Sequence, residues 1–353
     1  MESRIYKKNL SLGFTQSKHD YSLYVRSDNG KFLIALVYVE DVLLTGNNEE
    51  DIVSVKAALD AKFTIKDLGP ATYFLGIEIC RTANGTYLNQ RKYILGLLKE
   101  SGLTAAKPAD TLFPSDIKLS LTSGKLLASA KSYRRLVRRL LYLTMTRPDI
   151  SYPVQHLSQF VSNPTDEHMQ AARHLLRYLK GTICEGLFYL VQQSLQLTWF
   201  SDADWASCVM TRRSLTGYCI FLGHSLISWK TKKQPTVSRS STEAEYRSMA
   251  ATTCELLWLS YLLTDLHVPV KLPITLFCDN KSAQLIAANP CFHERTKHLA
   301  IDVHFTRDKI EEGFLQTAHI PSKLQLAELM TKPLTHEQHS ILSSKLGLSA
   351  PPV

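Results

Sequence analysis

Long apolar runs are missing from this sequence of 353 residues. The longest, Phe32–Val39, is far shorter than the roughly 20 residues that span a bilayer. The chain shows no basic–apolar–small leader pattern and no internal repeat. Its 7 cysteines include no CxxC pair, and their odd number indicates free thiols in a reducing compartment. We therefore expect an intracellular protein of the cytoplasm or nucleus, without a membrane span or a disulfide framework.

Negative charge is the scarcer sign. The chain has 41 Lys+Arg against 32 Asp+Glu, which gives a formal net charge of +9. With 44% hydrophobic and 21% charged residues, the composition is that of a globular protein with room for two or three domains. The excess of positive charge favours a polyanionic partner.

Strand and helix signals alternate over residues 1–103. Phe32–Val39 and Val42–Thr45 predict a hairpin whose tight turn carries Glu40 and Asp41. Asn48 is placed to cap a following helix. The other elements expected here are a strand over Tyr73–Cys80, a hairpin turn at Asn84-Gly85 and a helix from about Gln90 to Gly102.

Residues 104–130 have little periodicity and read as a flexible linker. Three helices should follow, over about Ser132–Met145, over about Ile150–Gln159 and from Thr165 to Gly181. Residues 336–353 form a polar tail that we expect to be disordered.

Basic side chains gather on one face of the first of these helices. They recur at i+3 and i+4, and we expect them to contact a phosphate backbone rather than only solvent: Arg134, Arg135, Arg138 and Arg139. A second candidate surface lies beside Trp229, for which an ordinary solvated hairpin is an equal alternative: Lys230, Lys232 and Lys233.

Acids stand at the ends of three separate elements in the last two-fifths of the chain. Asp202 and Asp204 end an apolar strand and would share one face of it. Glu245 opens a long apolar helix, and Asp279 ends another short strand. Two Mg²⁺ or Mn²⁺ ions that promote phosphoryl chemistry need such carboxylates close together.

Each acid also has a structural explanation. Thr242 and Glu245 match a capping box, in which case Glu243 would be the acid left at the surface. Asp279 could cap the helix that follows it, and Asp202 could pair with a nearby lysine. These alternatives compete with a metal site at each position.

The region from Trp199 to Leu334 resembles the ribonuclease H domain of copia-type retrotransposon polyproteins. The stretches that carry the likeness are SDADWA, RRSLTGYCIFLG, ISWKTKKQPTVSRSSTEAEY, CDNKSA, RTKH and LAELMTKPL. The resemblance implies a mixed five-stranded sheet with flanking helices, and a site that binds two Mg²⁺ or Mn²⁺ ions and cleaves RNA in an RNA·DNA hybrid. Carried over by position, its catalytic, metal-binding residues are Asp202, Glu245, Asp279 and Glu328. Glu328 stands where the family usually has Asp.

The hairpin turn Tyr38-Val39-Glu40-Asp41 resembles the YVDD signature of reverse transcriptases, within LVYVEDVLLTGN. Glu40 replaces the first Asp, and the family's third acid would lie upstream of residue 1. The resemblance therefore implies a truncated palm without polymerase activity, for which an intact retroelement polymerase would be the partner.

Together these features predict an α/β (α+β) chain. Its parts are a truncated palm-like region (1–103), a linker (104–130), a helical thumb or connection region (131–194), a ribonuclease-H-like domain (195–335) and a disordered tail (336–353). We expect either a metal-dependent hybrid ribonuclease or, alternatively, a nucleic-acid-binding remnant without catalysis.

Overall fold

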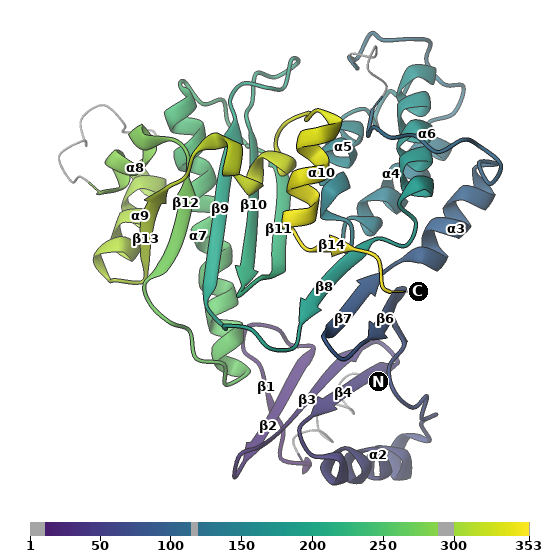
Figure 1. Ribbon diagram of the computed structural model, residues 1–353, viewed down its shortest axis with the longest axis vertical. Coiled ribbons are helices and arrows are strands. Elements are labelled where there is room, and N and C mark those ends of the chain that lie inside the picture. The colour runs from purple at the N-terminus through teal and green to yellow at the C-terminus, as the bar shows by residue number, and fades with distance from the viewer. Residues whose placement is uncertain (1–10, 114–118, 289–299, 353) are drawn as a thin grey trace. The chain divides into compact units, whose positions relative to one another are not determined.

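The computed structural model describes residues 11–113, 119–288 and 300–352 (Figure 1). Its contacts divide the chain into two compact units. The first comprises the chain up to Phe74 together with Cys254–Val270. The second comprises Leu75–Thr253 together with Lys271–Val353.

The first unit contains an antiparallel sheet in the order β1-β2-β3-β4. Its elements are β1 (Thr15–Gln16), β2 (Leu23–Asp28), β3 (Lys31–Tyr38), β4 (Asp41–Gly46), α2 (Glu49–Phe63) and β5 (Tyr73–Phe74). The hairpin predicted around Glu40 is confirmed as β3 and β4. The Asn48 side chain caps α2 by accepting the N–H of Asp51, as expected. Leu33 and Ala35 of the sheet pack against Val55 and Leu59 of α2.

The second unit holds two sheets and a group of helices. One set of strands lies in the order β14-β8-β7-β6: β6 (Ile77–Arg81), β7 (Gly85–Asn89), β8 (Gly186–Leu190) and β14 (Leu348–Ser349). The strand expected over Tyr73–Cys80 is interrupted, because Leu75 and Gly76 adopt positive φ angles of 47° and 79°. The helices are α3 (Arg91–Glu100), α4 (Lys131–Leu143), η1 (Pro148–Ile150), α5 (Ser151–Ser158) and α6 (Asp166–Gly181).

A buried ion pair anchors these helices. The guanidinium of Arg147 contacts the carboxylate of Asp149 at 2.6 Å, and both side chains are fully buried. The hydroxyl of Tyr178 on α6 donates to the same carboxylate at 2.9 Å. Because a buried charge is costly without partners, this network ties η1 to α6.

The expected disordered tail is instead ordered, which corrects the prediction. It forms α10 (His336–Lys345) and β14, and the Thr335 side chain caps α10. His339, Leu342 and Leu346 fall on one buried face, and the His339 ring contacts the Asp149 carbonyl oxygen at 3.2 Å. The polar composition of residues 336–353 does not indicate this narrow apolar face, because its packing partners lie far upstream in the sequence.

The predicted mixed five-stranded sheet is confirmed, in the order β11-β10-β9-β12-β13. β9 (Leu197–Asp204), β10 (Leu215–Leu222) and β11 (Ser225–Lys233) are antiparallel, whereas β12 (Ile274–Cys278) runs parallel to β9 and β13 (Leu315–His319). The helices associated with it are α7 (Ser241–Asp265), α8 (Lys281–Ala288) and α9 (Ala300–Glu311). Two short 3₁₀ segments follow β13, namely η3 (Ser322–Leu324) and η4 (Leu326–Met330), and Gln325 between them is extended.

The two faces of this sheet have different coverings. On one face η4 and α10 pack against β10 and β11 in a common core. On the other face, the Ser201 hydroxyl donates to Ser248 of α7. The ribbon of α7 runs along this sheet in Figure 1. In the parts of the chain that the structure describes, no helix is both long enough and apolar enough to cross a membrane.

Candidate metal centre at the strand ends

Asp202 lies near the end of β9 with its side chain only 1% exposed. β9 continues to Asp204, so the expectation that the two acids share one face is confirmed. Gly217 of β10 is paired with Asp202. A Cβ at Gly217 would lie 2.5 Å from the Thr331 methyl group and 2.7 Å from the Met330 Cβ. Glycine therefore lets η4 approach the sheet, and the Thr331 hydroxyl donates to the Asp202 carboxylate.

Glu245 is not the capping residue of α7. Ser240 accepts the N–H of Glu243 at 3.1 Å, and Glu243 accepts the N–H of Arg239 at 2.8 Å. These bonds occupy Glu243 and leave Glu245 for the sheet. One Glu245 oxygen accepts the N–H of Ala203 at 3.1 Å. Its other oxygen is buried and has no hydrogen-bond partner among the described residues.

Asp279 follows β12, at the same edge of the sheet as the end of β9 because the two strands are parallel. It accepts a hydrogen bond from the Ser322 hydroxyl at 2.7 Å. The cap of α8 is Asn280, whose side chain accepts the N–H of Ala283, so capping does not explain Asp279. Ligand atoms of Glu245, Asp279 and the buried Cys278 all lie within 4.8 Å of one another.

Glu328 lies on η4, half-buried, and reaches the same edge of the sheet. The ammonium group of Lys332 is 2.8 Å from its carboxylate and 3.5 Å from that of Asp202. The sequence alternative of a lysine paired with Asp202 is thus realised together with the cluster of acids. The sequence pattern does not mark Lys332 or Thr331 as site residues, although both belong to the stretch LAELMTKPL that carries the family likeness.

The pKa values of two of the clustered carboxyl groups are raised. Burial raises the pKa of Asp202 to about 6, and Asp279 and Glu328 add to the effect, while Lys332 and Thr331 oppose it. The pKa of Glu245 is raised well above its usual value, first by burial and then by Asp202. Repulsion between acids contributes to both shifts in pKa: Asp279 and Glu328 act on Asp202, and Asp202 and Asp279 act on Glu245.

These donors fit a hard divalent cation. Carboxylate oxygens are the ligands that Mg²⁺ and Mn²⁺ prefer, and a buried carboxylate oxygen without a hydrogen-bond donor is one that a cation would satisfy. Glu245 supplies such an oxygen beside Asp279. Asp202 and Glu328 provide a second pair of carboxylates, which Lys332 contacts.

The basic face of α4 is only partly available to a ligand. Arg134 donates to the carbonyl oxygens of Val161 and Ser162, and Arg139 pairs with Glu100 at 2.5 Å. Glu100 of α3 also contacts Arg135, at 3.4 Å. Arg135 keeps a side chain that is 70% exposed, and Arg138 is exposed as well.

The lysines of β11 divide in the same way. Lys230 and Lys232 are two positions apart, so they lie on the same face of the strand, and both are exposed. Lys233 instead turns toward α5, where its ammonium group contacts Gln159 at 3.1 Å and the sulfur of Cys208 at 3.4 Å. Two of the three predicted positions thus remain open to solvent.

The acids of the β3–β4 turn lie in the first unit. Tyr38 pairs with Asp41 across the hairpin, and Val39 has a positive φ of 54°. Tyr38, Val39, Glu40 and Asp41 are all exposed. Within the described residues no group of three possible metal ligands includes Glu40 or Asp41.

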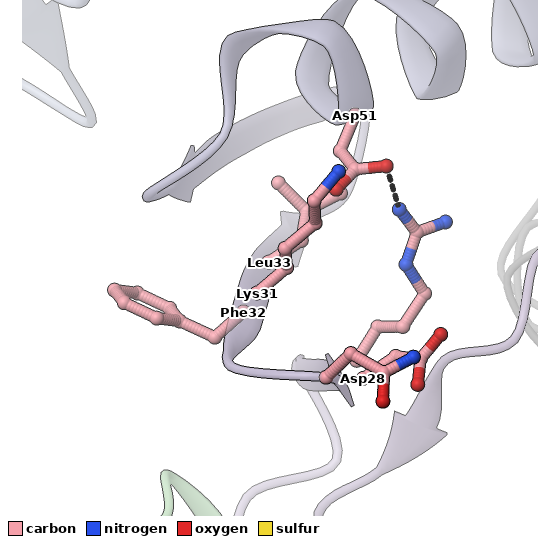
Figure 2. Close-up of a pocket in the computed structure, with 7 residues that line it drawn as sticks. Asp28, Lys31, Phe32, Leu33 and Asp51 are labelled. Atoms are coloured by element: carbon pink, nitrogen blue, oxygen red, sulfur yellow. Dashed lines mark ion pairs between the residues drawn. The ribbon is translucent and has the colours of Figure 1, made fainter.

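The first unit has a hollow between the β2–β3 hairpin and the start of α2 (Figure 2). Arg26 and Asp51 form an ion pair of 2.9 Å there, drawn as the dashed line. Asp28 and Lys31 also line the hollow. None of the predicted site residues contributes to it.

Known proteins resemble the chain along most of its length. The family model described as "Reverse transcriptase (RNA-dependent DNA polymerase)" matches residues 2–114. The retrovirus-related Pol polyprotein from transposon RE1 of Arabidopsis thaliana is 44% identical over 343 residues, 97% of this chain and 23% of that protein. The putative transposon Ty5-1 protein of Saccharomyces cerevisiae is 33% identical over 248 residues, 69% of this chain and 80% of that protein.

Among solved structures, the foamy viral protease-reverse transcriptase in complex with RNA/DNA hybrid is 13% identical, with a TM-score of 0.43, covering 82% of this chain and 36% of that one. The chain spans about a quarter of the length of the Arabidopsis Pol polyproteins that it matches. The sequence likeness extends over both the hairpin region and the carboxylate cluster, and the chain belongs to the copia-type retrotransposon Pol family.

Proposed function

We propose that this chain is a divalent-metal-dependent ribonuclease H, a piece of a retroelement Pol protein that cleaves the RNA strand of RNA·DNA hybrids. The observation that carries the proposal is the convergence of Asp202, Glu245 and Asp279 from three separate elements. Gathering charged carboxylates at one buried edge costs free energy unless they are protonated or a cation compensates them, and a divalent cation would do so for the whole set. Glu328 is the fourth member of the proposed set.

The surrounding residues hold these carboxylates in fixed orientations. The Ala203 N–H directs Glu245, the Ser322 hydroxyl directs Asp279, and the Thr331 hydroxyl directs Asp202. Bound Mg²⁺ or Mn²⁺, two ions in our proposal, would supply an activated water and stabilise charge on the leaving oxygen. Fixed ligands lower the reorganisation needed during reaction, and positioning of this kind accounts for much of catalysis.

The exposed cations are proposed to bind the hybrid. Lys230 and Lys232 lie on β11, and Arg135 and Arg138 lie on α4. Phosphate contacts by such side chains add affinity without sequence specificity. Arg134, Arg139 and Lys233 are assigned instead to holding the fold, because their polar atoms are engaged by protein partners.

The palm-like region is proposed to lack polymerase activity. Glu40 and Asp41 stand on an exposed turn, and among the described residues neither belongs to a group of three close metal-ligand atoms. Phosphoryl transfer to a primer end would need such a third ligand to hold the cations. Primer extension by this chain alone that Asp41→Asn abolishes would contradict this part of the proposal.

The alternative is a remnant that binds nucleic acid without cutting it, which the Lys332 contacts favour because they already neutralise part of the site. Incubation with end-labelled hybrid in Mg²⁺ or Mn²⁺ separates the two functions. Cleavage of the RNA strand of the hybrid, but not of single-stranded RNA, supports the ribonuclease. Binding without cleavage in either metal supports the remnant. Asp202→Asn protein purified in the same way controls for contaminating nucleases.

A further inference from the structure

Lys332 links the two acids at one end of the carboxylate cluster. Its ammonium group is 2.8 Å from Glu328 and 3.5 Å from Asp202, and the lysine side chain is 32% exposed. Contact with Glu328 alone would be an ordinary i,i+4 pair within one segment, of little energetic consequence. Contact with Asp202 is different, because it spans 130 positions of the chain and reaches a carboxylate that is only 1% exposed.

A buried carboxylate needs positive charge or hydrogen-bond donors nearby. The Thr331 hydroxyl serves one oxygen of Asp202, and Lys332 faces the other. A divalent cation would draw on the same oxygen and on Glu328. Two cations cannot share these ligands at contact distance without repelling each other, because like charges a few ångströms apart in a partly buried site are poorly screened.

We propose that Lys332 is a tethered counter-cation that neutralises Asp202 and Glu328 in the metal-free protein and competes with a divalent cation for them. It is a positioning residue, and the inference rests on the proposed metal-dependent function. The cluster then has two unequal ends. The end at Glu245 and Asp279, with its unpartnered oxygen, binds a cation first. The end at Asp202 and Glu328 binds one only when Lys332 moves away.

The test measures Mn²⁺ binding to the full chain without nucleic acid. Binding is monitored by titration calorimetry and by the loss of the electron paramagnetic resonance signal of free Mn²⁺. The parent should show one tighter and one weaker site. Lys332→Gln should tighten the weaker site about tenfold, because it removes the competing charge. Lys332→Arg keeps the charge and should resemble the parent. Unchanged or weaker Mn²⁺ binding by Lys332→Gln would overturn the proposal.

A matched control removes the same charge elsewhere. Lys309 of α9 forms an i,i+3 ion pair of 2.6 Å with Glu312, and its side chain is 23% exposed, comparable to that of Lys332. Lys309→Gln should leave Mn²⁺ binding unchanged. A tightening equal to that of Lys332→Gln would show that net charge alone matters, and would also overturn the proposal.

Thermal unfolding in EDTA gives a second readout that needs neither metal binding nor cleavage. Lys332→Gln should melt at a lower temperature than Lys309→Gln, and saturating Mn²⁺ should close the gap, because it replaces the lost charge. Equal melting temperatures in EDTA would refute the counter-cation role. Hybrid cleavage by the parent is scored separately, so an inactive parent defeats the proposed function while the EDTA comparison still decides the role of Lys332.

Discussion

Replacing Gly217 with alanine tests whether the approach of η4 to the sheet builds the site. The added methyl group would lie 2.5 Å from the Thr331 Cγ2, 2.7 Å from the Met330 Cβ and 3.1 Å from the Ala327 carbonyl oxygen. Thr331 cannot rotate its methyl group away without losing the hydrogen bond from its hydroxyl to Asp202. The segment must therefore move outward.

Overpacking of this kind costs about 1–3 kcal/mol of unfolding free energy. A shift of η4 by about 1 Å would also displace Thr331 and Glu328 relative to Asp202. Misplacement on that scale lowers catalytic rates on the order of a hundredfold. We expect Gly217→Ala to lose both stability in urea and rate of hybrid cleavage, with the loss of rate persisting at temperatures where the variant is fully folded.

Two further variants make the measurement specific. Gly96→Ala in α3 places its methyl group in open space and should be neutral or stabilising by about 0.5–1 kcal/mol. Thr331→Ser keeps the hydroxyl but removes the clashing methyl group, so it should partly restore Gly217→Ala. A Gly217→Ala protein that matches the parent in both stability and cleavage rate would refute this account of the site.

Other changes should have the following effects. Glu328→Asp shortens the fourth carboxylate to the length usual in the family and should raise Mg²⁺-supported cleavage more than Mn²⁺-supported cleavage, because Mg²⁺ is the stricter ion; equal or slower rates in Mg²⁺ contradict this. Substituting glutamine for both Arg135 and Arg138 should weaken hybrid binding and reduce the slope of log K against log salt by up to about two units. An unchanged slope would mean that neither arginine contacts the phosphate backbone. Burial lowers the pKa of His156 to about 4. Its contribution to stability is therefore complete above its unfolded pKa of about 6.5 and is lost as pH falls toward 4, by about 2 kcal/mol between pH 7 and pH 5. In urea unfolding, His156→Gln should lose correspondingly less unfolding free energy than the parent between pH 7 and pH 5. The same pH dependence in both proteins would contradict the lowered pKa of His156.

Local patterns predicted much of the ribonuclease-H-like region. The apolar runs before Asp202 and Asp279 located β9 and β12, and the apolar segment that Glu245 opens located α7. These elements carry their own periodicity, so their signals do not depend on distant partners. The position of Asp202 at a strand end followed directly.

Features that depend on tertiary contacts could not be predicted in this way. The sequence does not distinguish Glu243 from Glu245; the hydrogen bonds that join Glu243 to Ser240 and Arg239 do. The partner of Asp202 lies 130 positions away in Lys332. The four arginines of α4 form one basic face in the sequence, but Glu100 of α3 and the carbonyl oxygens of Val161 and Ser162 after α5 engage part of it. The glycine at position 217 was the one local sign of close approach, since glycine within a strand often marks it.

The most direct test of the account is the rate of RNA-strand cleavage by Asp202→Asn, Glu245→Gln and Asp279→Asn in Mg²⁺ and in Mn²⁺. Each substitution keeps the shape of the side chain and removes its charge, and urea unfolding verifies that the fold persists. Asp308→Asn, at an exposed position on α9, provides the matched control. We predict that the three site variants fall to background while the control cleaves at the parental rate. Parental cleavage by all three site variants would contradict the assignment of this cluster as the catalytic centre.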